Sequence, residues 1–348
     1  MKRLMVFIYS IIHFVVDLSC ATLVLGVLSP KIDSITTGFM VILLYDFFAF
    51  AIQFPIGVIA DKINKNAILS AIGCLIIIVA YGISKYVILA SIIAGIGNAL
   101  FHVGGGIDVL NISKKRATLP GIFVSTGAMG IFLGSKLGKV GMSKYYILII
   151  SLLLSIIVLL WLFNAIKDDI KNEFVIIPKL DNNKVIAILC LIITVAIRSY
   201  VGLILVFDWK NTFVLALISI FAIVFGKMIG GIIGDRIGFI PISFISLGVA
   251  SILFLFSFNS AIIGILAIFF FNMTMPITLT AIANILPNNK GMAFGILSFS
   301  LFIGLIPALF DNKLLLFNPI GLFTITIISA IILYIGIKKY YLVENKND

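Results

Sequence analysis

The sequence predicts an all-α protein that crosses a membrane with twelve helices, arranged as two pseudo-symmetric bundles of six. Of its 348 residues, 62% are hydrophobic and 11% are charged, whereas a soluble domain is about half apolar and about a quarter charged. The apolar runs are roughly 20 residues long, the length of a helix that crosses a hydrocarbon core about 30 Å thick. These runs also lack the polar and apolar alternation of a membrane β-barrel, which leaves helices as the spanning elements.

Charged residues, prolines and polar clusters divide the chain into its predicted spans. The first span follows Lys2 and Arg3. We interpret it as a membrane helix rather than a signal peptide, because Asp17 interrupts it and no small-residue cleavage site follows. Only Ser84 and Lys85 separate the third span from the fourth. The twelve spans are 4–28, 36–60, 67–84, 86–110, 118–139, 144–166, 184–206, 212–234, 240–258, 261–286, 290–310 and 317–338.

The distribution of Lys and Arg predicts how the chain is oriented. Sixteen of these residues lie at the two termini and in alternate loops, and six lie in the opposite loops. Because positive residues concentrate on the cytoplasmic side, both termini are expected in the cytoplasm, with the spans in the cell (inner) membrane. The net charge of +11 is explained by this orientation, so no nucleic acid is expected as a partner.

One polar segment divides the spans into six and six. It predicts an N-terminal bundle at 1–166, a cytoplasmic linker at 167–184 and a C-terminal bundle at 185–348. Two short motifs repeat across this linker: "GVIADKI" from Gly57 resembles "GIIGDRIG" from Gly231, 174 residues later, and Gly121 and Gly291 lie in similar surroundings 170 residues apart.

A loop of the type G-x-x-x-D-[RK]-x-G-[RK]-[RK] after the second span, repeated after the eighth, is similar to the signature of the major facilitator superfamily. The first copy departs from it at Asn64 and Asn66, and the second copy lacks the trailing basic residues. The resemblance implies a cytoplasmic gate that latches the two halves, with Asp61 near the start of the eleventh helix, where a carboxylate suits the positive end of the helix dipole. For Lys62 and Lys65, a tight turn with orienting charges is an equal alternative. Asn64 stands where Gly is usual and tolerates a left-handed turn. The gate residues are Gly57, Asp61, Lys62, Gly231, Asp235, Arg236 and Gly238.

A narrower resemblance is carried by "HFVVDLS" in span 1, "GIGNALFHVGGGIDVLNISKKRATLPGIFVSTGAMGIFLGSKLG" across spans 4 and 5, and "AIRSYVG" in span 7. These segments are similar to the fosmidomycin-resistance-type exporters of that superfamily, which implies efflux. In the superfamily, spans 1, 4, 7 and 10 line a central cavity. By that resemblance the polar residues expected to converge there are His13, Asp17, Asn98, His102, Arg198, Asn272 and Thr274.

Ionisable residues inside spans are costly, by about 2.5 kcal/mol or more, so each requires a function or a partner. His13 and Asp17 are four residues apart and share one helix face. We expect Asp17, with His13, to be the proton-coupling site, and Arg198 to be its counter-ion or the anchor of an anionic substrate group; the alternative is a structural pair that joins spans 1 and 7. Asp46 is a candidate second protonation site.

Two further polar residues lie on span 4. His102 is a candidate substrate contact or proton relay, while Asp108, near Lys114 to Arg116, is expected to be a structural charge at the membrane interface. The glycines of span 5, including Gly130 and Gly134, predict a close-packing helix face. Pro276 and Pro307 predict bends in spans 10 and 11.

The sequence lacks a P-loop, and its two histidines and three cysteines have no metal-binding spacing. We therefore expect no cofactor, no metal and no enzymatic activity. The leading hypothesis is a proton-coupled transporter that expels a small amphiphilic or anionic compound by alternating access. Its partners would be that small molecule, protons and the lipid bilayer, and a monomer is expected. The alternatives are a proton-coupled importer of an organic anion or small metabolite, and a non-transporting membrane sensor or assembly partner.

Overall fold

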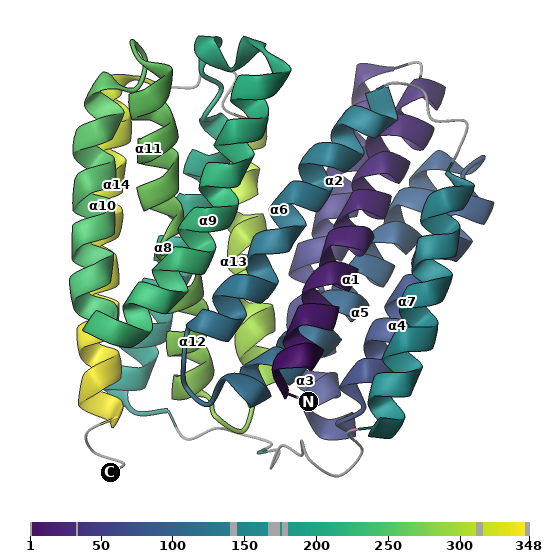
Figure 1. Cartoon of the computed structure of the whole chain (residues 1–348), viewed down its shortest axis with the longest axis horizontal. Helices are drawn as coiled ribbons and strands as arrows, with labels where there is room; N and C mark the ends of the chain where they lie inside the picture. The colour runs from purple at the N-terminus through teal and green to yellow at the C-terminus, as the bar shows by residue number, and fades with distance from the viewer. Residues whose placement is uncertain are drawn as a thin grey trace. The chain divides into compact units, whose positions relative to one another are not determined.

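The computed structural model describes residues 2–32, 34–139, 145–165, 175, 180–310 and 316–344. Throughout these ranges the regular structure is helical (Figure 1). Most of the linker expected at 167–184 lies outside the described residues. The predicted division into an N-terminal and a C-terminal bundle at that linker stays a prediction.

Fourteen α-helices form in the described ranges, joined in places by short π-helical and 3₁₀ turns. They are α1 (Lys2–Thr22), α2 (Ile35–Asp46), α3 (Gln53–Ile63), α4 (Asn66–Gly82), α5 (Val87–Ser113), α6 (Thr118–Lys139), α7 (Tyr146–Ala165), α8 (Asn182–Ile204), α9 (Phe213–Ile237), α10 (Phe239–Phe256), α11 (Ala261–Asn272), α12 (Met275–Ile285), α13 (Lys290–Phe310) and α14 (Pro319–Glu344).

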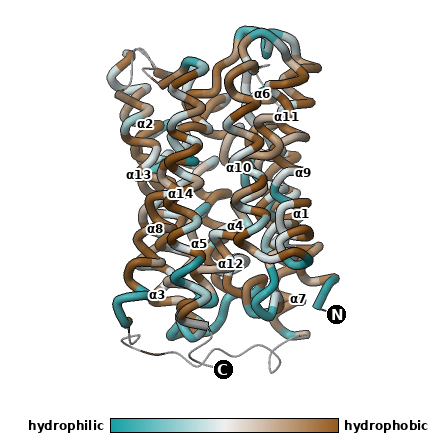
Figure 2. The backbone as a smooth tube through the Cα atoms, turned by 90° about the vertical axis from the view of Figure 1, so that its left-hand side faces the viewer, coloured by the Kyte–Doolittle hydropathy of each residue, from teal (hydrophilic) through white to brown (hydrophobic). Residues whose placement is uncertain are grey.

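These helices match the twelve predicted spans. In the part of the chain that the structure describes, eleven helical segments are long and apolar enough to cross a membrane, and α4 is a shorter apolar helix. A π-helical turn, Phe47–Ala51, joins α2 and α3 into one span. Hydrophobic residues run along the helices, as the hydropathy colouring in Figure 2 shows. The predicted all-α fold with twelve spans is confirmed.

The tenth span is broken into α11 and α12 at Met273 and Thr274, just before Pro276. Proline lacks the backbone N–H that would continue the helical ladder, which accounts for the position of the break. The break lies against α9, where a side-chain carbon on Gly230 would collide with the backbone carbonyl of Met273. The helix of this span is thus interrupted beside Pro276, where the bend is predicted, whereas α13 continues as one helix through Pro307.

The chain forms two compact units. Unit 1 comprises 1–112, 126–174 and 288–299, and unit 2 comprises 113–125, 175–287 and 300–348. Helices α6 and α13 therefore each contribute one part to unit 1 and one part to unit 2. In unit 2, α14 packs against α8 and α10, and in unit 1, α4 packs against α7.

The glycines of α6 pack directly on α1 within unit 1. A side-chain carbon added at Gly130 would collide with the backbone oxygen of Phe14, and one added at Gly134 would collide with the backbone oxygen of Leu18. Small residues allow two helix backbones to approach this closely in a membrane, where packing rather than hydrophobicity drives association. The predicted close-packing face of span 5 is confirmed.

A methyl group at this contact should be poorly tolerated. We expect Gly130→Ala to destabilise the protein by about 1–3 kcal/mol, because the backbones of α1 and α6 must separate. Gly248 on α10 is the matched control, since nothing lies within 4 Å of a carbon added there and alanine favours a helix over glycine. The measurement is the thermal unfolding midpoint of each variant in detergent, and a midpoint for Gly130→Ala at or above that of Gly248→Ala would contradict this packing.

Candidate functional site

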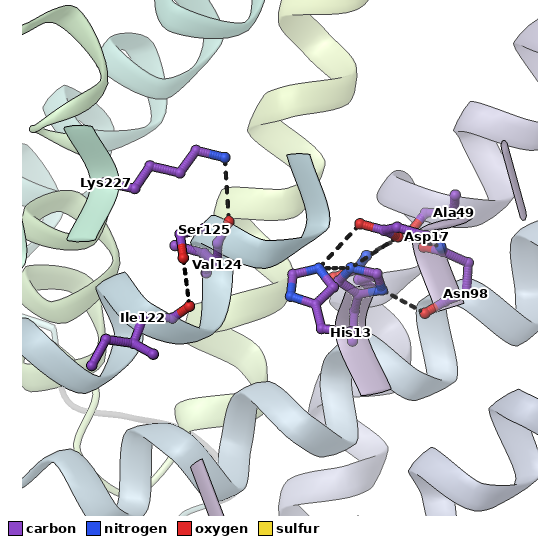
Figure 3. Close-up of polar contacts among 10 residues, drawn as sticks. His13, Asp17, Ala49, Asn98, Ile122, Val124, Ser125 and Lys227 are labelled. Atoms are coloured by element: carbon purple, nitrogen blue, oxygen red, sulfur yellow. Dashed lines mark hydrogen bonds and ion pairs between the residues drawn. The ribbon is translucent and has the colours of Figure 1, made fainter. Parts of the chain in front are cut away.

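A cluster of ionisable side chains lies between α1 and α5 in unit 1. His13 and Asp17 are one helical turn apart on α1, with His13 Nε2 3.2 Å from Asp17 Oδ2. His102 of α5 places its Nε2 3.6 Å from Asp17 Oδ1 and 2.8 Å from His13 Nε2. Asn98, one turn before His102, donates its side-chain amide to Asp17 Oδ1 over 3.1 Å (Figure 3).

The hydrogen bonds of His102 determine where its proton lies. Its Nδ1 is 2.9 Å from the backbone oxygen of Asn98, and a carbonyl oxygen only accepts, so Nδ1 carries the hydrogen. In the neutral ring Nε2 is then an acceptor. With His102 neutral, the contact between the two Nε2 atoms is a hydrogen bond that His13 donates, and the His13 proton then lies between the His102 ring and the Asp17 carboxylate.

The cluster is enclosed by protein. His13 is 5% exposed and Asp17 is 6% exposed. Gly127 of α6 covers the pair, because a side-chain carbon there would collide with both Asp17 Oδ2 and His13 Nε2. Both histidines lie close enough to the Asp17 carboxylate to form an ion pair when their rings are protonated. A buried carboxylate thus has two imidazoles as its charge partners.

Unit 2 holds the other residues expected to line the cavity. Arg198 of α8 is buried and donates from Nη1 to the Thr278 hydroxyl over 3.3 Å. Asn272 donates its amide to the Ile268 backbone oxygen, and the Thr274 hydroxyl lies 3.5 Å from the Phe271 backbone oxygen. The structure thus brings His13, Asp17, Asn98 and His102 together, while the predicted convergence of Arg198, Asn272 and Thr274 on Asp17 stays a prediction.

Asp46 lies apart from the cluster. It ends α2, immediately before the π-helical turn, and it is partly exposed. Within the described ranges no hydrogen bond or ion pair to its carboxylate is found. Its role as a second protonation site stays a prediction.

Asp108 lies five residues before the end of α5. Its carboxylate is buried, and it accepts hydrogen bonds from the Tyr9 hydroxyl and the Asn66 amide, each over 2.7 Å. This network ties α5 to α1 and α4, so the structural role expected for Asp108 is supported by different partners. Its expected place at the membrane interface stays a prediction. Sequence reasoning missed Tyr9, although it lies four residues before His13 on the same face of α1.

The aspartate of the first gate motif contacts the start of α13. Asp61 accepts hydrogen bonds from the backbone amides of Gly291, over 2.7 Å, and Met292, over 2.8 Å. The first amides of a helix have no partner within the helix and carry partial positive charge, so a carboxylate satisfies both needs. The position expected for Asp61 is confirmed. Asn64 adopts the left-handed conformation, with φ of 54°, as expected for the residue in place of glycine.

The second gate motif makes the equivalent contact at the start of α6. Asp235 accepts from the backbone amides of Ala117, over 2.6 Å, and Thr118, over 2.9 Å. Gly231 packs against the Ala117 carbonyl as Gly57 packs against that of Gly291. The repeated motif therefore has a repeated structural role, at the fifth span in one copy and the eleventh in the other.

The other residues of the two motifs do not take part in these contacts with helix starts. Lys62 and Arg236 are exposed. Gly238 ends α9 with φ of 93°, a conformation that favours glycine. Orienting charges beside a tight turn are consistent with these positions.

Comparison with known proteins identifies the family. A model described as Major Facilitator Superfamily matches residues 5–309. The chain belongs to the Major Facilitator Superfamily. As a member it is a multi-pass membrane transporter rather than an enzyme, and a small molecule is its substrate.

Solved structures of Major Facilitator Superfamily transporters share this fold. The E. coli fucose:proton symporter, FucP, matches with a TM-score of 0.64 at 12% identity, over 96% of this chain and 98% of that one. A second structure of FucP, in the outward conformation, matches with a TM-score of 0.59 at 14% identity, over 96% and 99%. A bacterial homologue of the iron transporter ferroportin, outward-facing, matches with a TM-score of 0.64 at 11% identity, over 98% and 99%. At these identities the likeness shows the fold. No curated protein sequence matches the chain.

Loss of the Asp61 carboxylate should cost stability at the start of α13. We expect Asp61→Ala to destabilise the protein by about 1–3 kcal/mol, because one buried and one partly buried backbone amide lose a charged acceptor. Lys62→Ala, at the adjacent exposed position, should change stability by less than about 0.5 kcal/mol. Thermal unfolding midpoints in detergent measure both effects, and equal midpoints for the two variants would show that the contact contributes nothing.

Proposed function

We propose that this Major Facilitator Superfamily member is a secondary transporter coupled to protons, and that His13, Asp17 and His102 hold the coupling proton. The close approach of two imidazoles and one carboxylate, at 2.8, 3.2 and 3.6 Å, is the observation that carries this proposal. Charge buried inside a membrane protein is costly, so the occupancy of such a site responds to any change in its exposure or partners. Alternating access supplies that change, because it opens the same residues to each side of the membrane in turn.

The remaining polar residues receive roles in substrate binding. Arg198 makes no ion pair with the residues that the structure describes, and it donates one hydrogen bond to a neutral hydroxyl. A buried guanidinium without a carboxylate partner is suited to an anionic substrate group or to a carboxylate counter-ion such as Asp17. Asn98, His102, Asn272 and Thr274 are proposed as further substrate contacts, and Asp46 as a second protonation site.

We propose efflux of a small amphiphilic or anionic compound as the direction, on the resemblance of spans 1, 4, 5 and 7 to fosmidomycin-resistance-type exporters. Uptake of an organic anion or small metabolite is the second candidate. The buried Arg198 is suited to an anionic substrate in either direction of transport. In both cases Asp61 and Asp235 are proposed to hold a cytoplasmic gate. A monomer in the cytoplasmic membrane with both termini inside is proposed for either direction.

Replacing Asp17 should abolish coupling. The measurement is growth of an efflux-deficient bacterium across a compound panel that includes phosphonates, with wild type, Asp17→Asn or Asp108→Asn expressed at matched membrane levels. We expect the wild type and Asp108→Asn to protect against at least one compound and Asp17→Asn to give no protection. Sensitisation by the wild type would replace efflux with uptake, and full protection by Asp17→Asn would reject Asp17 as the coupling residue.

Replacing Arg198 should weaken binding of anionic substrates selectively. We expect Arg198→Gln to raise the half-saturating concentration of an anionic substrate about 10-fold or more, because a charged hydrogen bond contributes about 1.5–3 kcal/mol. A neutral substrate of the same panel should be affected little. Transport into or out of vesicles measures both values, and an equal change for neutral and anionic compounds would remove Arg198 as an anion anchor.

A further inference from the structure

We propose that His13, Asp17 and His102 form a binding site for a divalent transition-metal cation. One donor atom from each residue lies within 4.8 Å of the other two, and the closest pairs are 2.8, 3.2 and 3.6 Å apart. Zinc-type cations lie about 2.0–2.2 Å from imidazole nitrogen and carboxylate oxygen. Donors around one such cation are therefore about 3.0–3.4 Å apart. The two imidazole contacts are made to different oxygens of Asp17, Oδ2 and Oδ1, so small side-chain rotations would bring one donor atom from each residue to that spacing.

The hydrogen bonds behind the donors match those of metal ligands. His102 donates its Nδ1–H to the Asn98 backbone oxygen. Its Nε2 lone pair therefore faces the ligand atoms of His13 and Asp17. Ligating histidines typically donate their second ring N–H to a backbone carbonyl or carboxylate in this way, which fixes the tautomer and the ring orientation. The Asn98 side chain holds Asp17 through Oδ1. Two ligands are thus oriented by one neighbouring residue.

The charge of the cluster also favours a cation. It contains one carboxylate and two imidazoles, and Gly127 of α6 adds no side chain where it covers the pair. Imidazole nitrogens select first-row transition metals and zinc, whereas magnesium and calcium prefer all-oxygen sites. Two histidines and one carboxylate supply three of the four ligands of a tetrahedral zinc-type site.

Sequence spacing does not reveal this site, because His102 is separated from Asp17 by more than eighty residues. The inference goes beyond the proposed function and does not require it, since the three donors can bind a metal whether or not protons drive transport.

Equilibrium titration of the purified full chain in detergent, with its affinity tag removed, tests the site. We expect Co²⁺ to produce visible d–d absorption bands that saturate at one ion per chain, and Zn²⁺ to compete for the same site, while Mg²⁺ gives no competition. His102→Ala should weaken Co²⁺ binding about 100-fold, as expected for the loss of a ligand when loss of a supporting hydrogen bond already costs about 10–100-fold.

Two further variants, Asn98→Ala and Asp108→Asn, distinguish the positioning of the Asp17 ligand from a general disturbance of the fold. Asn98→Ala removes the amide that holds Asp17 but keeps the backbone oxygen for His102, so we expect about a 10-fold weaker affinity with the one-ion stoichiometry retained. Asp108→Asn, a buried carboxylate outside the cluster, should bind Co²⁺ like the wild type. Each variant must elute as a monodisperse peak with wild-type helicity.

Two results would overturn the inference: a wild-type chain that binds neither Co²⁺ nor Zn²⁺ stoichiometrically, or a folded His102→Ala variant with wild-type affinity. Metal binding by a chain whose transport is independent of protons would uphold the site and reject proton coupling. Proton-coupled transport by a chain that fails to bind either metal would uphold proton coupling and reject the metal site.

Discussion

The contact between α1 and the glycine face of α6 is the constraint on which the site depends. Because Gly127 and Gly130 bring the two backbones together, the face of α1 that carries His13 and Asp17 is closed on one side without a side chain. Its remaining polar neighbours come from α5, which supplies His102 and Asn98. The glycines of α6 thus allow the helix backbone itself to enclose the ionisable side chains of α1.

The two gate motifs show how repeated sequence produces repeated structure. Each uses an aspartate to accept from two backbone amides at the start of another helix, and each places a glycine against that helix start. The electrostatic reason is the same in both, because the exposed amides at a helix start need an acceptor and favour negative charge. Asp61 and Asp235 therefore anchor the starts of α13 and α6, two helices that are divided between the compact units.

Features that depend on local composition were predictable from the sequence. The twelve spans follow from the length of apolar runs, the break near Pro276 follows from proline's missing N–H, and the contact of Asp61 follows from a recognised motif. Features that depend on how helices are rotated against one another were not predictable. The basic residues Lys114 to Arg116 are the nearest charges to Asp108 in sequence, whereas its hydrogen-bond partners come from α1 and α4. The meeting of His102 with His13 is of the same kind, since no spacing in one chain encodes it.

The break in the tenth span has a consequence for how that span moves. Between Asn272 and Met275 the ladder of backbone hydrogen bonds is interrupted, and a helix resists bending chiefly through that ladder. The segment around Met273 and Thr274 is therefore where this span opens at the least cost in free energy, and its amide hydrogens should exchange with solvent before those in the middle of α11 or α12. The span therefore consists of two hydrogen-bonded segments that meet at an interrupted ladder, and Gly226 and Gly230 of α9 allow the backbones of Phe269 and Met273 to pack directly against α9 beside it.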